Sequence, residues 1–280
     1  MVREFYLENE FGIQWNLNHL NNGFLVFPKG LGYSRDASYA AIGNSFIRNY
    51  MREEQQQITG TIIFGTTAPY RICSKFLNYV NSAEQLKLLY VTDAGEYYRN
   101  VDLVEIEKTE ITKEGVLECP VTFICRGLFY SNQVERFVIS RSDGEVRWDF
   151  TWPARFNDYG SRKVTVDNTG HVPAGLQLEL YGYCENPTVI VSKNGNELYR
   201  VVFPIILQQD EKILYSSMDG DLYCIRVGDD GAEENLINLL DIRNTNFFKF
   251  PVGSSQVEIT SDTGETNRTV MTVYRFFRMV

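Results

Sequence analysis

The sequence predicts a mainly β protein with two domains, an α+β domain that carries one helix and an all-β domain that follows it. Three observations lead to this prediction. Apolar residues alternate with a period of two along much of the chain, which is typical of strands with one buried face. Only one segment shows sustained helical spacing. Short turn signals rich in Gly, Asn and Asp separate the alternating runs and are densest in the second half.

The composition is that of a folded, acidic protein. Of the 280 residues, 44% are hydrophobic and 22% charged, which supplies enough apolar material for real cores. The 17 Tyr and 18 Phe favour the half-buried surfaces of strands. A net charge of −9 without a long Lys/Arg cluster argues against sequence-specific nucleic-acid binding, because phosphates attract basic patches. Such a surface would let DNA slide past it.

The clearest strands are predicted where apolar and polar residues alternate most regularly. In each of these runs every second residue is apolar, so these residues share one face of the strand. These faces are Ile58, Gly60, Ile62 and Phe64; Leu86, Leu88 and Tyr90; and Leu117, Cys119, Val121, Phe123 and Cys125. In residues 102–107 we expect Val104 and Ile106 to face inward and Glu105 and Glu107 to face solvent. Turns are expected at 93–95 and 113–115.

One helix is predicted over residues 69–81. Pro69 suits the first helical turn, where its missing N–H costs nothing, and Ile72, Phe76, Leu77 and Val80 recur at helical spacing. Before it, residues 34–57 show no sustained period and become rich in glutamine. We interpret this stretch as a long excursion or arm, since excursions of such length within a domain are usually functional.

The pattern changes around residues 128–140, and we place a domain boundary near residue 135. Domain 1 would then span residues 1–135 and domain 2 residues 136–280. In domain 2 short strands, such as the one containing Leu176, Leu178 and Leu180, alternate with turns, which predicts a sandwich or jelly roll. Turns are expected at 142–144, 168–170, 194–195, 219–220, 230–231 and 263–264, and residues 268–280 should form a long closing strand.

The cysteines and the N-terminus indicate a reducing compartment. The five cysteines, Cys73, Cys119, Cys125, Cys184 and Cys224, are odd in number and contain no CxxC pair, so we expect buried free thiols. The first residues lack an apolar signal core, and no run is long enough to span a membrane. We therefore expect a protein made in the cytoplasm, without membrane insertion, that reaches any other place by assembly.

The sequence contains no recognisable catalytic, cofactor-binding or metal-binding motif. His19 and His171 stand in no HExxH motif and beside no cluster of ligands, which disfavours zinc. The nucleophile elbow and the Walker pattern are missing, and the lone GxG at 30–32 is best interpreted as a turn. We expect no catalytic, cofactor-binding or metal-binding residues, and hence no cofactor and no enzyme activity.

Three further groups of residues have a functional and a simpler structural explanation. Glu105 and Glu107 could serve as a catalytic carboxylate pair, but a solvated strand face explains them better. Acidic residues at 219–221 and 229–230 could hold calcium, although acidic hairpin tips are common. Trp148 and Trp152, near Phe150, could stack on a sugar, but three aromatics of one parity more often belong to a core.

Several short segments follow one another in a specific order and spacing over the first 130 residues. These are Arg3–Asn9 followed by Gly12, Trp15–Asn18, Phe27–Gly32 with Tyr39 and Gly43, Ile58–Phe64, the helix with Tyr70, Phe76 and Val80, and then Leu88–Tyr90, Tyr98, Val101 and Lys108–Glu110. In this order and spacing, the first 130 residues resemble the distal tail proteins of phages and prophages of Gram-positive hosts.

This resemblance implies a structural role at the virion's tail tip. The first domain would be a tail-tube-like former of homohexameric rings with one packed helix and a long arm. The second would be a galectin-like β-sandwich, although the sugar-contacting residues of true galectins are not found here. Expected partners are further copies of the chain, the tail tube protein, a tail-associated fibre or lysin protein, and a receptor-binding or upper baseplate protein. The ring would join tube to tip in host attachment while DNA passes through it.

Three other readings stay open at this point. The chain could be a carbohydrate-binding module of the tail, for which Trp148 and Trp152 are the candidates. It could be a tail enzyme, which would need two carboxylates in unlike environments. It could be a tail-tube subunit, although the additional β domain after residue 135 favours the tip.

Overall fold

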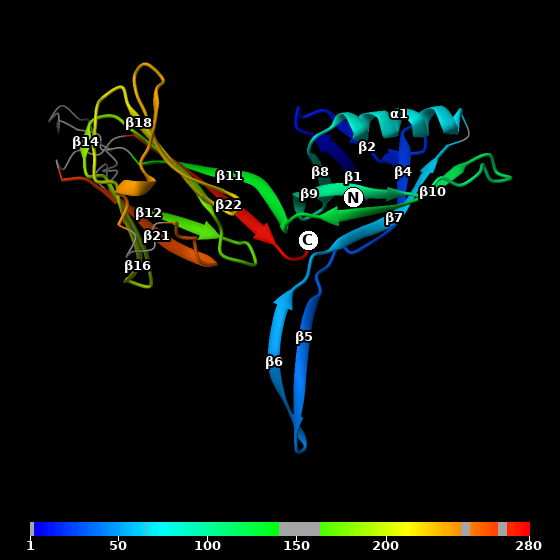
Figure 1. Cartoon of the computed structure of the whole chain (residues 1–280), viewed down its shortest axis with the longest axis horizontal. Helices are drawn as coiled ribbons and strands as arrows, with labels where there is room; N and C mark the ends of the chain where they lie inside the picture. Colours follow the sequence, from blue (N-terminus) through cyan, green and yellow to red (C-terminus); the bar gives the residue numbers. More distant parts are fainter. Residues whose placement is uncertain (1–2, 66, 140–162, 242–246, 263–267) are drawn as a thin grey trace, which may run out of the picture. The chain divides into compact units, whose positions relative to one another are not determined.

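The computed structural model describes residues 3–65, 67–139, 163–241, 247–262 and 268–280 (Figure 1). The chain divides into two compact units, Met1–Asn132 with Phe276–Val280, and Gln133–Arg275. The sequence predicts residues 276–280 in the second domain, whereas their contacts group them with the first unit. These last residues return to the first unit, where Phe277 packs edge-on against Tyr97 with ring centroids 5.2 Å apart.

The first unit is built on a branched antiparallel sheet with one helix. Its strands lie in the order β2-β1-β8-β9-β10-β7-β4-β3, and β9 also pairs with β11. Their bounds are β1 Glu4–Asn9, β2 Gln14–Asn16, β3 Asn18–His19, β4 Gly23–Lys29, β7 Gln57–Phe64, β8 Leu86–Thr92, β9 Gly95–Ile106, β10 Leu117–Cys125 and β11 Phe129–Ile139. Among the described residues of the first unit, these strands pair antiparallel.

The alternation of apolar residues predicts the buried faces of β7, β8 and β10 correctly. Every second residue of β10, from Leu117 to Cys125, is buried, and these side chains join one core with those of β7 and β8. In β9 the expectation fails at Val104, which is 57% exposed. The pairing of β9 with β10 shifts register there, so a β-bulge turns Val104 outward together with Glu105.

The predicted helix is confirmed as α1, Pro69–Ser82. Pro69 occupies the start of the helix, and Ala68 before it adopts a positive φ of 55°. Phe76 is buried and contacts Trp15 and Phe64, with ring centroids 5.6 and 6.0 Å away. The predicted apolar stripe therefore packs on the sheet, and it supplies the helical part of the first unit's core.

The second unit contains two sheets around one core. One sheet has the order β20-β19-β18-β13-β22 and the other β12-β21-β15-β16. Their bounds are β12 Lys163–Asn168, β13 Leu176–Tyr181, β15 Thr188–Lys193, β16 Asn196–Val202, β18 Lys212–Met218, β19 Asp221–Val227, β20 Glu233–Asn235, β21 Gly253–Thr260 and β22 Thr269–Phe277. The short strands β14 Cys184–Glu185 and β17 Ile206–Leu207 pair with each other, and η1 spans Ile237–Leu239.

Buried side chains from both sheets form the second core, which makes this unit a β-sandwich. Leu176, Leu178 and Leu180 face it from one sheet, and Val257 and Ile259 from the other. The Asn194-Gly195 hairpin is confirmed, since both residues have positive φ angles, 52° and 78°, and join β15 to β16. The mainly β fold, with one α-helix among the described residues, is thus confirmed, while the predicted turns at 142–144 and 263–264 both lie outside the described residues.

Candidate functional site: an exposed arm and its root

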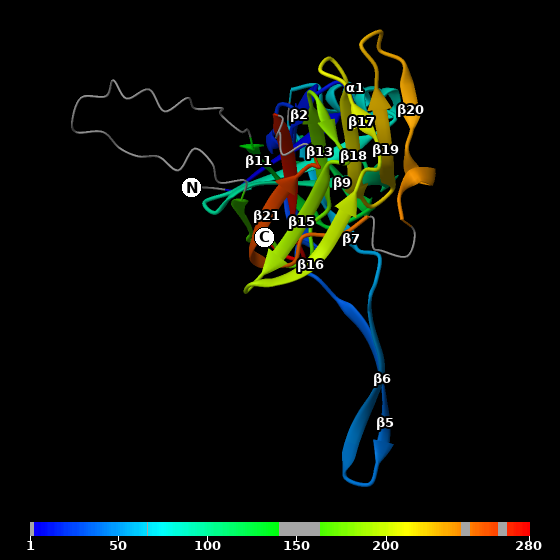
Figure 2. The same cartoon turned by 90° about the vertical axis from the view of Figure 1, so that its left-hand side faces the viewer.

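Residues 34–57 form an arm, and within it the structure contains a regular β-hairpin that the sequence did not predict. Strand β5, Arg35–Ile42, pairs along its length with β6, Ser45–Glu53, and the two extend away from the sheet of the first unit (Figure 1, Figure 2). Gly43, at φ 59°, begins the two-residue turn. Because neither face of this hairpin is buried, its sequence carries no alternation, and periodicity could not reveal it.

The arm exposes large apolar side chains. Phe46 is 75% exposed, Ile42 59% and Ile47 55%, and every residue of β6 is exposed. A two-stranded hairpin without a covered face is marginally stable in water, and contiguous exposed apolar side chains usually mark an interaction site. Both outer edges of the hairpin also have backbone groups free to pair with another strand.

Arginines gather in the half of the arm that lies next to the sheet. Arg35, Arg48, Arg52 and Arg278 line one hollow of about 590 Å³. Glu53 pairs with both Arg35 and Arg278, and Asp36 pairs with Arg52 at 3.0 Å. Four guanidinium groups therefore share two carboxylates, which leaves this surface positive in a protein of net charge −9.

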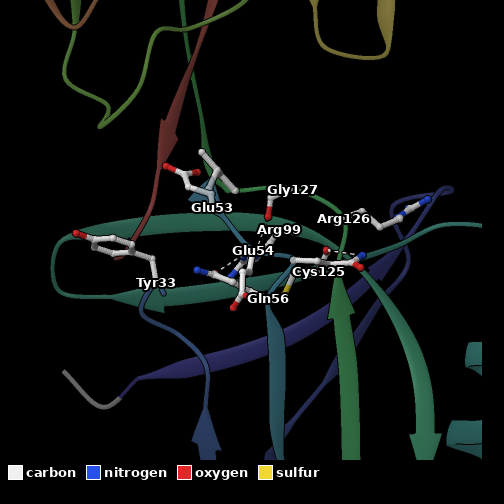
Figure 3. Close-up of a pocket in the computed structure, with 10 residues that line it drawn as sticks. Tyr33, Glu53, Glu54, Gln56, Arg99, Cys125, Arg126 and Gly127 are labelled. Carbon is white, nitrogen blue, oxygen red and sulfur yellow. Dashed lines mark hydrogen bonds between the residues drawn. The ribbon is translucent and has the colours of Figure 1, made fainter. Parts of the chain in front are cut away.

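At the root of the arm lies a buried arginine, Arg99 of β9, only 2% exposed (Figure 3). Its Nε donates to the carbonyl of Gly127 at 2.8 Å and its Nη2 to Oε1 of Gln56 at 2.6 Å. The guanidinium also lies 4.7 Å from the ring centroid of Phe129. Its Nη1 is buried without a partner, and burial lowers the pKa of the group. The Arg99 guanidinium is therefore held by two neutral oxygens, those of Gly127 and Gln56, and not by a carboxylate of the described residues.

The hydrogen bonds of Arg99 join the connection at the end of the arm to the connection that follows β10. Gln56 lies between β6 and β7, and its carbonyl accepts from the backbone N–H of Cys125 at 2.9 Å. Gly127 lies between β10 and β11. Arg99 therefore ties the two connections together beside a hollow of about 380 Å³ that Glu53 and Glu54 also line. Burial raises the pKa of the Cys125 thiol, so it stays protonated there rather than acting as a nucleophilic thiolate.

The candidates drawn from the sequence do not come together. His19 and His171 are both exposed and belong to different units. Glu105 and Glu107 are exposed at the end of β9, as a solvated pair would be. Residues 30–32 lie in the connection between β4 and β5, where no helix begins, so the GxG is a turn and not a dinucleotide loop.

The acidic residues weighed as calcium ligands are separated by a strand. Asp219 and Asp221 lie at the start of β19, and Asp229 and Asp230 follow its end. Seven strand residues span roughly 20 Å, so the two pairs cannot share one ion. Among the described residues no group of three potential metal ligands occurs. Trp148, Phe150 and Trp152 lie outside the described residues, and the sugar-stacking hypothesis for them stays untested.

All five cysteines are buried and free, as predicted. The sequence reasoning missed Arg99 and the arginines of the arm. A signal for Arg99 existed, because it pairs directly with Leu88 and shares its parity with Val101. A charge at an apolar position of a strand indicates a buried, hydrogen-bonded role.

Solved structures with this fold come from phage baseplates and hubs. The chain is 18% identical to a protein in the baseplate of phage p2 in its activated conformation with Sr, covering 100% of both chains at a TM-score of 0.65. The corresponding structure with Ca gives 18% identity, the same coverage and a TM-score of 0.64. SPP1 Dit (gp 19.1), a hub adsorption apparatus protein of Gram-positive infecting phages, is 8% identical, with coverages of 97% and 98% and a TM-score of 0.65.

The chain therefore shares its fold with these phage baseplate and hub proteins. Residues 4–126 match the family model described as the N-terminal domain of the distal tail protein. The resemblance inferred from the sequence is confirmed over these residues. No curated protein sequence matches the chain. In the described part of the chain, no helix has the length and apolarity to cross a bilayer.

Proposed function

We propose that this protein forms a homohexameric ring that joins the tail tube to the tail tip, with the β5–β6 arm of each copy lying on its neighbour. The observation that carries the proposal is the exposure of the arm. Its apolar side chains have no cover within the chain, and burying them at about 25 cal/mol per Å² would offset the ordering of the hairpin. A contact between unlike surfaces of identical chains generates a ring when its rotation closes.

The second unit would project partners from this ring. Its sandwich is complete around its own core, so it can act as a module for docking. We expect it to hold a receptor-binding or upper baseplate protein, and the ring itself to contact the tail tube protein and a tail-associated fibre or lysin protein. The galectin-like character of this sandwich is part of the proposal. The acidic chain would let DNA pass through the ring without electrostatic attraction to it. We expect the tail to be assembled in the host cytoplasm.

We propose further that the protein is not an enzyme. Catalysis needs a nucleophile or a general acid–base pair held by neighbouring groups. Among the described residues the histidines stand apart and the cysteine thiols are buried.

A pair of matched variants tests the arm contact. Phe46→Ser with Ile47→Ser removes two exposed apolar side chains at the arm tip, and we expect native mass spectrometry to show loss of assembled rings with an unchanged monomer fold. The control is Leu222→Ser, which changes a side chain 53% exposed in the second unit. Rings of undiminished abundance in the arm variant, or equal loss in the control, would count against the proposal.

A further inference from the structure

The far end of the β9–β10 pair is strongly acidic. Residues 105–118 contain five glutamates and two lysines, and all five glutamates are exposed. We call this segment the acidic end. No described residue forms an ion pair with any of its glutamates, although Glu110 accepts a hydrogen bond from Tyr70 at 2.6 Å. Five glutamates against two lysines leave the segment with a net charge of −3, next to the exposed apolar side chains of Val104 and Ile111.

The arm presents the opposite charge. Arg48 has no carboxylate partner among the described residues, and its Nη1 lies 3.9 Å from the sulfur of Met51. Arg52 bonds Asp36, but its own side chain is 72% exposed. Exposed arginines beside exposed Tyr39 and Tyr50 match in both charge and apolarity the surface of the acidic end.

One copy cannot bring these two surfaces together. In the ladder of β7 with β10, Gln57 pairs with Ile124 at one end and Phe64 with Leu117 at the other. The arm joins the sheet at Gln57, and Leu117, where the loop of the acidic end returns to the sheet, lies roughly 24 Å along the strands from there. Glu105, opposite Thr122, lies nearer to the arm, whereas Glu110 and Glu114 belong to the loop that follows β9. The arm also extends away from the sheet (Figure 1). A contact of the arm with this loop must therefore join different copies.

We propose that the arginine face of the arm, formed by Arg35, Arg48, Arg52 and Arg278, binds the acidic end of a neighbouring copy. The inference rests on the ring proposed above and names the surface that the arm recognises. The two surfaces differ, so the contact is heterologous, as a ring requires. Complementary charge would orient the neighbour and reject the reversed arrangement, while the apolar side chains of the arm supply most of the buried area.

A second copy fits the arginine face better than nucleic acid does. Only four arginines are present there and two carboxylates already partly neutralise them. Glutamates elsewhere on the same unit would repel phosphates, whereas they are the natural partners of guanidinium groups.

Charge reversal on each side, alone and together, tests the contact in the full-length chain. The arm variant is Arg48→Glu with Arg52→Glu, and the acidic-end variant is Glu107→Arg with Glu114→Arg. The control, Arg71→Glu with Lys75→Glu, reverses two exposed charges on α1. Circular dichroism confirms folding, and analytical ultracentrifugation measures self-association at low and high salt.

We expect each reversal to weaken self-association about tenfold or more and the combined variant to recover to within roughly threefold of the native chain. Association of the native chain should also fall with salt. Arm variants that associate like the native chain, or a combined variant no better than either parent, overturn this inference and leave the ring standing. If the arm variant loses binding to DNA while its self-association stays unchanged, the inference is overturned too. A native chain that stays monomeric at every concentration, with single copies in assembled tail tips, overturns ring and inference together.

Discussion

At position 99 a charged residue occupies a place in β9 that faces the core. Burying a guanidinium without a carboxylate is costly, and its unpartnered Nη1 adds to that cost. Two hydrogen bonds, to Gln56 and Gly127, and the contact with the ring of Phe129 offset part of this cost. Arg99 therefore fixes the direction in which the arm leaves the sheet.

Replacing Arg99 with Ala should lower the free energy of unfolding by about 2–4 kcal/mol, because it leaves a cavity over Phe129 and the buried Gly127 carbonyl without a donor. Chemical denaturation provides the measurement. The matched control is Arg126→Ala, which removes a half-exposed side chain that bonds Asp102 at 3.4 Å and should cost less than about 1 kcal/mol. Equal costs for the two variants would show that Arg99 has no special role.

Glu105 and Glu107 allow a test of the non-enzymatic proposal. Both are exposed, so Glu105→Gln with Glu107→Gln should change stability by no more than about 0.5 kcal/mol per site. We expect neither the native chain nor this variant to cleave peptidoglycan or host polysaccharide. Cleavage by the native protein that disappears in a folded double variant would establish a tail enzyme instead.

At the scale of elements, α1 is tied to the first strands by Tyr79. Its hydroxyl lies 2.8 Å from the carbonyls of Leu7 and Ile13. Burial and the nearby carboxylates of Glu8 and Glu10 raise the pKa of Tyr79 to about 12. The neutral phenol is therefore favoured in the folded state, and its stabilisation is complete below the ordinary pKa of 10.0 and lost as pH rises from there towards 12.

The variant Tyr79→Phe should be less stable than the native chain by about 1 kcal/mol at neutral pH, through loss of the hydrogen bond. That difference should shrink above pH 10, because the variant has no phenol to ionise. Urea unfolding of both proteins across this range gives the comparison. A difference that stays constant to pH 11.5 would mean that Tyr79 does not contribute through its protonation state.

Sequence patterns predicted those elements that bury one face. The helix from Pro69 and the apolar face of β10 follow directly from periods of 3.6 and 2. The β5–β6 hairpin buries neither face, so nothing in its pattern distinguished it from an irregular excursion. Val104 was misplaced because a β-bulge, which adds one residue to a strand, leaves no mark on composition. The sequence therefore predicted that residues 34–57 form an arm, but it did not predict that the arm is a β-hairpin.

For the whole molecule, the proposed boundary near residue 135 predicts a second domain that folds alone. The compact unit spans Gln133–Arg275, so this fragment is the one to express. We expect β-type circular dichroism and a single cooperative melt, because both sheets of the sandwich and their shared core lie within it. An insoluble fragment, together with one melting transition for the full chain, would show that the units depend on each other.

The most direct test of ring formation is the mass of the purified full-length protein by light scattering, over concentrations up to its solubility limit and with micrographs of tail tips beside it. The account predicts a species of six times 32.3 kDa, or approach to that mass as concentration rises, and six-fold rings in the tips. Monomer in dilute solution alone would not contradict it, because partners can nucleate a ring. A strictly monomeric mass at every concentration, with single copies in assembled tips, would contradict it.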